Sequence, residues 1–125
     1  MSHISVLQTK LVDRSILIEA LTKLGYTVKE GDNLEVHGLE KSIKVDLMID
    51  VPYSAPIGFR QSSSGFKIVA DWFRIQLDQK TFKNQIMQQY AYISVMKTLA
   101  KQGFQVIKEE TGEKNQIHLL LRRTN

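Results

Sequence analysis

The histidines and the absence of cysteine decide most of the metal chemistry open to this sequence. His3, His37 and His118 are far apart and show neither a His-x-His nor a His-x-x-x-His spacing, the patterns that bring two imidazoles to one metal ion. The 125 residues include no cysteine, so the chain has no disulfide, no thiol nucleophile and no thiolate metal ligand. We therefore expect no metal site and no cofactor.

Two aspartates share one face of a predicted strand over residues 43–51. Asp46 and Asp50 are about 13 Å apart there, because four successive residues rise roughly 3.3 Å each. Carboxylates at that distance hold one ion only with help from a neighbouring strand, for which Asp71 is the candidate. The alternative is ion pairing across strands with one of three cations: Lys44, Lys67 or Arg60.

Phosphate-binding and nucleophile motifs are absent from the sequence. A nucleotide site needs a glycine-rich loop between a strand and a helix, and neither predicted junction, residues 10–15 or 76–81, contains a glycine. The serines form no nucleophile elbow. We predict no catalytic residue, although an enzyme with dispersed active-site residues remains an alternative.

Basic and aromatic residues leave open a weak RNA- or DNA-binding domain, in which rings stack on bases beside a cationic surface. The residues concerned are Arg60, Lys67, Arg74, Arg122 and Arg123 with Trp72, Phe73, Tyr90 and Tyr92. The net charge is only +4 and the cations are scattered, whereas phosphate contacts dominate such affinities. Nucleic-acid binding is therefore the alternative and not the leading prediction.

The leading prediction is a non-enzymatic protein-interaction module. Amide and phenol groups hydrogen-bond a partner without the desolvation cost of a charge, and tyrosine is enriched at interfaces. Such amide and phenol side chains are concentrated in one segment of the helix predicted over residues 78–103. The strand predicted before that helix, over residues 66–72, is irregular at its end. The candidate surface comprises Asp71, Trp72, Gln89, Tyr90 and Tyr92. The structural alternative is a helix with glutamines in solvent and tyrosines half-buried.

A long helix over residues 78–103 organises the chain. Phe82, Ile86 and Ile93 recur on one stripe of a 3.6-residue period. Asp78 is the predicted N-cap and Gly103 the predicted stop. A shorter helix is expected from Asp13 as its cap to Gly25.

The segments after the two helices are similar. Each helix is succeeded by glycine, an aromatic residue, a strand, a polar turn and a second strand, which predicts a strand–helix–hairpin unit present twice. The first hairpin is expected around residues 31–33 and the last over residues 104–109 and 117–122. Leu119, Leu120 and Leu121 in a row suggest a strand covered on both faces.

Side chains over residues 43–51 alternate strictly between two faces, which predicts a strand with one face on the core and the other in solvent. The core face is expected to carry Ile43, Val45, Leu47, Ile49 and Val51, and the solvent face Lys44, Asp46, Met48 and Asp50. Further strands are expected over residues 3–11, 57–61 and 66–72. The alternation slips near Trp72, as it does at a β-bulge or where two strands meet.

Together these elements predict an α+β fold with a mostly antiparallel sheet of seven to eight strands and two helices in a single domain, residues 1–125. Hydrophobic content of 42% and charged content of 24% are typical of a soluble globular protein. No apolar run is long enough to span a membrane, so we expect no membrane partner.

Several short motifs, in order and spacing along the whole chain, resemble one family. They are Met1-Ser2-His3, Leu24-Gly25-Tyr26, Ile57-Gly58-Phe59, Val69-Ala70-Asp71-Trp72, Gln88-Gln89-Tyr90-Ala91-Tyr92 and Gln102-Gly103-Phe104. The family is the uncharacterised group of hypothetical chloroplast reading frames numbered thirty-five, from algal plastids and cyanobacteria. The ending Leu121-Arg122-Arg123-Thr124 departs from the Gln-Arg-Trp-like ending of that family.

The resemblance implies a plastid-encoded protein of the chloroplast stroma, or a cytoplasmic one if the source is a cyanobacterium. The N-terminus lacks the features of a signal or transit peptide, which agrees with a protein that works in the compartment where it is made. The resemblance implies no activity, cofactor or catalytic residue.

Overall fold

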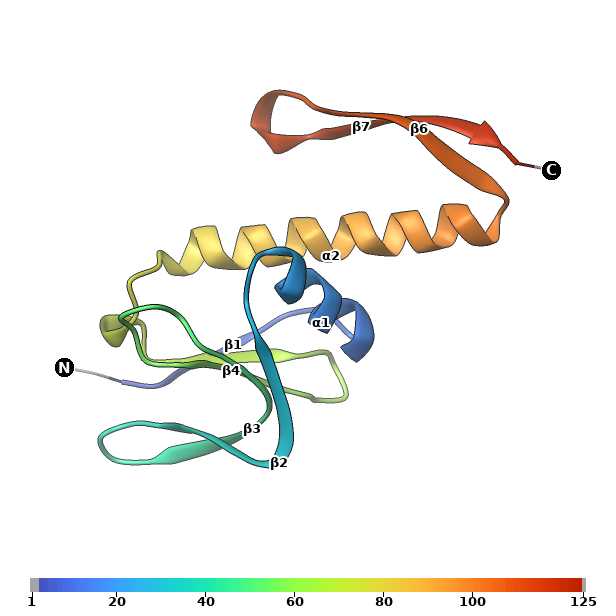
Figure 1. The fold of residues 1–125 in the computed structure, drawn as a ribbon. Coiled ribbons are helices and arrows are strands. Elements are labelled where there is room, and N and C mark those ends of the chain that lie inside the picture. Colours follow the sequence, from blue (N-terminus) through green and yellow to red (C-terminus); the bar gives the residue numbers. More distant parts are fainter. Residues whose placement is uncertain (1–2, 125) are drawn as a thin grey trace. The chain divides into compact units, whose positions relative to one another are not determined.

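The computed structural model describes residues 3–124, which form two compact units that divide between Ala91 and Tyr92. The first unit contains β1 (Ser5–Gln8), α1 (Arg14–Lys23), β2 (Val28–His37), β3 (Ser42–Ile49), β4 (Ile57–Arg60), β5 (Lys67–Ala70), the 3₁₀ turn η1 (Trp72–Arg74) and the first half of α2 (Gln79–Lys101) (Figure 1). The second contains the rest of α2, β6 (Phe104–Thr111), the 3₁₀ turn η2 (Glu113–Asn115) and β7 (Ile117–Arg123). Whether the chain is one domain stays a prediction.

The α+β prediction is confirmed. Five strands of the first unit form one sheet in the order β1-β5-β4-β3-β2, and β6 and β7 form a two-stranded sheet. All of these neighbours pair antiparallel. No helix among residues 3–124 is both long enough and apolar enough to cross a membrane.

Both helices begin and end as predicted, because the signals are local. The Asp13 carboxylate accepts a hydrogen bond from the Ile16 N–H at 3.1 Å, and Asp78 accepts one from the Thr81 N–H at 2.9 Å. The Thr81 backbone and hydroxyl both donate to Asp78, which lowers the pKa of that carboxyl. Gly25 and Gly103 follow the helices with φ of 96° and 81°, where a side chain would be strained.

The main core of the first unit lies between its helices and one face of the five-stranded sheet. Leu17 and Leu21 of α1 and Phe82 and Ile86 of α2 are all buried there. The sheet and the residue just before β5, Phe66, contribute a further set of buried side chains: Leu47, Ile49, Ile57, Phe59, Phe66, Ile68 and Ala70. Burying each large aliphatic or aromatic side chain stabilises the fold by about 1.5–3 kcal/mol.

The opposite face of the sheet carries a second, smaller core, so the prediction that Met48 points into solvent is wrong. Met48 is buried with Val36, Val45 and Val69, and Val45 does not join the main core as its alternation suggested. The register pairs Met48 with Gly58 and Gly58 with Val69. Because Gly58 has no side chain, Val36 and Val45 can pack over it; a Cβ there would lie only 2.6–2.7 Å from their methyl groups.

The hairpin predicted around residues 31–33 is also wrong. These residues lie inside β2, where the register with β3 shifts between Glu30 and Leu34. The turn comes after β2 instead, where the Gly38 N–H donates to the Lys41 carbonyl at 2.8 Å. The order strand, helix, hairpin does occur twice, but the first hairpin turns at residues 38–41 and belongs to the large sheet.

The end of β5 differs from the predicted bulge. The strand stops at Ala70, and the next residues form η1, with Asp71 as the cap of that turn. The slip of alternation at Trp72 therefore marks the end of a strand. Residues 3–11 are likewise strand only over Ser5–Gln8.

The C-terminal hairpin is confirmed, but β7 is not covered as predicted. Among the strands of residues 3–124 it pairs only with β6, and Leu120 on one of its faces is 55% exposed. Leu119 and Leu121 on its other face are half-buried.

Candidate functional site: the paired loops

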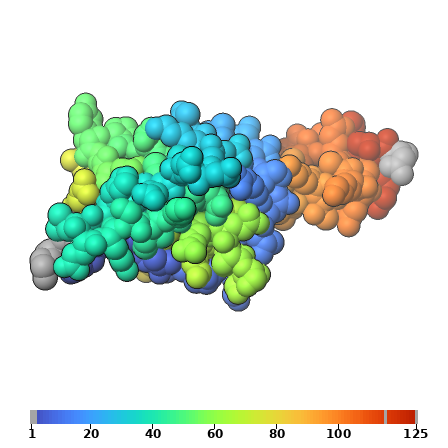
Figure 2. Space-filling view, turned by 90° about the horizontal axis from the view of Figure 1, so that it is seen from below, coloured from blue at the N-terminus to red at the C-terminus, as the bar shows by residue number. Residues whose placement is uncertain are grey.

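Two loops of the first unit are bonded to each other beside the sheet. We call them the paired loops, residues 52–55 and 72–76. The Ala55 N–H donates to the Arg74 carbonyl at 2.9 Å, and the Gln76 N–H donates to the Ser54 hydroxyl at 2.7 Å. The Ser54 hydroxyl in turn donates to the Pro52 carbonyl at 3.2 Å. Figure 1 shows the green loop beside η1, and in Figure 2 the green loop projects next to yellow atoms that follow η1.

The paired loops present two large aromatic side chains to solvent. Tyr53 is 91% exposed and Phe73 is 78% exposed. Tyr53 also has a φ of 57°, a left-handed conformation that costs a residue with a side chain roughly 1 kcal/mol. Pro52 precedes Tyr53, and the Ser54 N–H donates to the Val51 carbonyl at 3.2 Å, which closes a turn around Tyr53. The hydrogen bonds from Ala55 and Gln76 hold this turn in place. The ring of Tyr53 is thus displayed at the tip of a fixed loop.

Asp71 and Trp72, two of the residues predicted from the sequence, lie beneath this surface. Asp71 is 1% exposed, and its Oδ1 accepts a hydrogen bond from the Phe73 N–H at 3.2 Å. The ring of Trp72 is half-buried against Phe82, with centroids 5.8 Å apart. Within residues 3–124, no group hydrogen-bonds to Asp71 Oδ2 or to Trp72 Nε1, although both atoms are buried. These two residues therefore fix the loop that carries Phe73.

Tyr90 connects α2 to the start of α1. Its hydroxyl oxygen accepts hydrogen bonds from the Val12 and Asp13 N–H groups at 3.3 and 2.9 Å. The ring is half-buried against the main core. Gln89, beside it in the chain, is also half-buried. The Tyr90 hydroxyl thus has an evident structural role, which is the alternative that the sequence left open.

Tyr92 belongs to the second unit. Its hydroxyl donates to a carboxylate oxygen of Glu109 on β6 at 2.9 Å, which links α2 to the hairpin. The hydrogen bond to Glu109, together with burial and the negative charge of Glu109, raises the pKa of Tyr92.

The structure places Trp72 in the paired loops and Asp71 directly before them, and it gives Tyr90 and Tyr92 separate contacts. That all five predicted residues form one contact surface stays a prediction. Sequence reasoning placed Phe73 among possible stacking rings and overlooked Tyr53. The signal available for Tyr53 was its position in a short loop between Pro52 and Pro56.

The predicted ion pairs of the aspartates are wrong. Asp50 pairs with Lys29 at 3.0 Å, and Asp46 Oδ2 accepts the Gln61 N–H at 2.7 Å. Asp46 thus holds the chain just after β4, while Asp50 joins β2 to the end of β3. In the part of the chain that the structure describes, no three His, Asp or Glu residues lie together as metal ligands would.

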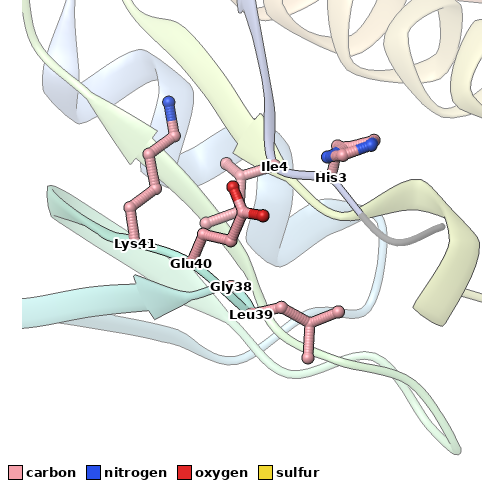
Figure 3. Close-up of a pocket in the computed structure, with 6 residues that line it drawn as sticks. All are labelled: His3, Ile4, Gly38, Leu39, Glu40 and Lys41. Carbon is pink, nitrogen blue, oxygen red and sulfur yellow. The ribbon is translucent and has the colours of Figure 1, made fainter.

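A hollow of about 230 Å³ lies where the N-terminal segment meets the turn between β2 and β3. Its polar side chains are His3, Glu40 and Lys41, and within residues 3–124 no hydrogen bond or ion pair joins them to one another (Figure 3). Lys41 and Leu39 extend from the turn in different directions. These groups do not converge on a common point, so the hollow does not resemble a small-molecule site.

A pair of cations lies on the outer face of the sheet. Lys67 is directly opposite Arg60 on one side and Gln8 on the other. Neither cation has an ion-pair partner among the described residues. Like charges directly opposite in a sheet repel, so this pair would gain from an anion.

Comparison with known proteins identifies relatives over the whole chain. Residues 20–120 match the family described as "Protein of unknown function (DUF1257)". The chain is 30% identical over 130 residues to "Uncharacterized protein ycf35" of Pyropia yezoensis, covering 100% of this chain and 99% of the relative. It is 30% identical over 127 residues to the protein of the same name from Cyanophora paradoxa, covering 98% of each. These relatives are plastid-encoded, consistent with a plastid location. No solved structure matches the chain.

Proposed function

The chain belongs to the DUF1257 family of proteins of unknown function, and we propose that it is a non-enzymatic module that binds a protein partner through the paired loops. The observation that carries the proposal is the display of Tyr53 and Phe73 on loops that hydrogen-bond to each other.

The chemistry of this surface suits a protein partner. Aromatic residues and arginine are enriched at the centres of interfaces, and Arg74 is exposed directly after Phe73. A ring that is already fixed loses little conformational entropy on binding, so more of its contact energy appears as affinity. Both rings are available for burial, since more than three-quarters of each residue's surface is exposed.

The surface predicted from the sequence overlaps with this one. Asp71 and Trp72 support η1, which carries Phe73. We propose that they act by positioning Phe73, while Gln89, Tyr90 and Tyr92 remain candidates for peripheral contacts through the parts of their side chains that face solvent.

The test is affinity capture from nuclease-treated plastid extract with three forms of the chain: the natural one, Tyr53→Ala/Phe73→Ala and Leu39→Ala. Leu39 is the matched control because it is 78% exposed, like Phe73, but lies in the turn between β2 and β3. We expect one stoichiometric protein to bind the natural chain and Leu39→Ala but not the double variant. Equal capture by all three forms would contradict the proposal.

Nucleic-acid binding is the second candidate, and the Lys67–Arg60 pair is the observation that favours it. Replacing both with glutamine should lower the salt concentration at which the chain leaves an RNA column, because phosphate contacts release counterions. The matched control replaces the exposed Lys23 and Lys80, with the same change in net charge. If both double variants leave at the same salt concentration, only net charge matters and this candidate fails.

A further inference from the structure

The hairpin of the second unit has two outer edges that no described strand pairs. An unpaired edge presents a row of backbone N–H and C=O groups, and natural proteins protect such edges with charges, bulges or proline. A two-stranded sheet on its own is also only marginally stable in water. An edge of this hairpin that lacks such protection is therefore a candidate for pairing with another strand.

β6 carries these protective features along its length, whereas the charges of β7 lie only at its C-terminal end. Lys108, Glu109 and Glu110 follow one another on β6, and its register with β7 shifts at Ile107. β7 reads Ile-His-Leu-Leu-Leu-Arg-Arg: Arg122 and Arg123 stand at its end, and no acidic residue, lysine, glycine or proline interrupts the residues before them. An edge of this kind readily pairs with another strand.

The apolar centre of β7 is symmetric about Leu120. We propose that β7 pairs antiparallel with β7 of a second copy of this chain, with Leu120 opposite Leu120. That register places Leu119 opposite Leu121 on either side of the centre. The same residues then meet from both chains, which is the requirement for a two-fold interface. The result is a four-stranded sheet with β6 of each copy at its protected outer edge.

This register keeps the basic ends of the two β7 strands apart. Within one chain, Glu110 lies opposite His118 and Gln105 lies opposite Arg122, all on the face that carries Leu120. The Arg122 side chain donates to the Gln105 amide oxygen at 2.9 Å. In the paired sheet, Arg122 of the second copy lies opposite His118 and on the same row as Glu110. Glu110 already pairs with Lys108 at 2.8 Å, and Arg122 and Arg123 of the second copy meet His118 and Ile117, so no like charges lie directly opposite each other.

Leu120 offers apolar surface at the centre of this pairing. It is 55% exposed, and its cross-strand neighbour on β6 is Lys108, which leaves the other flank of Leu120 open. A leucine from the second copy fills that flank and buries apolar surface on both chains.

The absence of cysteine allows a direct test by disulfide trapping. In Leu120→Cys the two new thiols lie directly opposite each other, within the range of Cβ separations that a disulfide or a close cross-strand pair has. Ile107→Cys is the matched control, since Ile107 is 52% exposed but lies on β6. We expect Leu120→Cys to form the disulfide-linked dimer at least about tenfold faster than Ile107→Cys under mild oxidation.

The second measurement is the mass of the natural chain in solution, which does not depend on the folding of a variant. Sedimentation should give twice the chain mass in the micromolar range, and Leu120→Lys should lower the dimer fraction while Ile107→Lys leaves it unchanged. Three results would overturn the proposal: a monomer at all concentrations up to hundreds of micromolar, trapping that is as fast through Ile107→Cys, or a dimer that Leu120→Lys does not weaken. A monomer whose β7 instead captures a different protein would also exclude the second copy as the occupant.

Discussion

Gly58 lies where the second core presses closest to the backbone of the sheet. A Cβ at this position would be 2.6 Å from a methyl group of Val45 and 2.7 Å from one of Val36. Both neighbours are buried, so they can move only by disturbing the cluster around them.

Gly58→Ala should therefore destabilise the chain by about 1–3 kcal/mol, the usual cost of overpacking a core. Gly31→Ala is the control, because a Cβ there meets only Leu34, at the ordinary distance of 3.8 Å. Urea unfolding of the two variants measures the difference. Equal unfolding free energies would show that the Val36–Val45 cluster yields easily.

A substitution at Tyr90 measures how much its hydroxyl contributes to the stability of the fold. Tyr90→Phe removes the oxygen that accepts the Val12 and Asp13 N–H groups before α1, and we expect a loss of about 1 kcal/mol. Tyr53→Phe is the control, since it removes the hydroxyl of an exposed ring. Thermal melting of both variants provides the comparison. If Tyr90→Phe melts at the same temperature as the natural chain, water replaces the hydroxyl at no cost in stability.

At the scale of elements, the bond from Tyr92 to Glu109 ties the C-terminal half of α2 to β6. The pKa of Tyr92 is higher in the folded chain than the value of 10.0 expected in the unfolded chain. The contact therefore contributes its full stability below pH 10.0 and loses it as the pH rises through the pKa of the folded chain.

Glu109→Gln should lower the pKa of Tyr92 toward 10.0, because the amide keeps an acceptor but removes the negative charge. The phenolate absorbance of the four tyrosines reports this change, and Tyr92→Phe identifies which component belongs to Tyr92. A titration curve that is identical in Glu109→Gln would show that the carboxylate of Glu109 does not perturb Tyr92.

Elements with local sequence signals were predicted correctly. Predictions were wrong where contacts between residues far apart in the chain determine the structure. Asp13 and Asp78 cap helices through residues three positions away, so both caps could be read directly. Residues 31–33 look like a turn, yet β3 holds them within β2. The alternation of residues 43–51 places Met48 on the solvent face, but in the fold it is buried with Val36, Val45 and Val69.

The candidate site could be predicted only in part for the same reason. The sequence indicated Asp71 and Trp72 through a break in alternation, although that break ends a strand and is not a bulge. It could not place Tyr53 beside this segment, because the bonds from Ala55 and Gln76 that join the paired loops link residues about twenty positions apart.

At the scale of the whole molecule, the two units offer different kinds of surface. The first unit displays fixed aromatic rings, and the second has an unpaired apolar strand edge. If both proposals hold, each dimer carries two copies of the paired loops. A partner with two matching sites would then bind with an avidity above that of one loop surface.

Site-directed photo-crosslinking tests most directly whether the paired loops bind a protein. A photoreactive benzoylphenylalanine replaces either Tyr53 or Leu39, and each variant is irradiated in nuclease-treated plastid extract. We expect one discrete protein adduct from position 53 and none from position 39. No adduct from position 53, or the same adduct from both positions, would contradict binding through the paired loops.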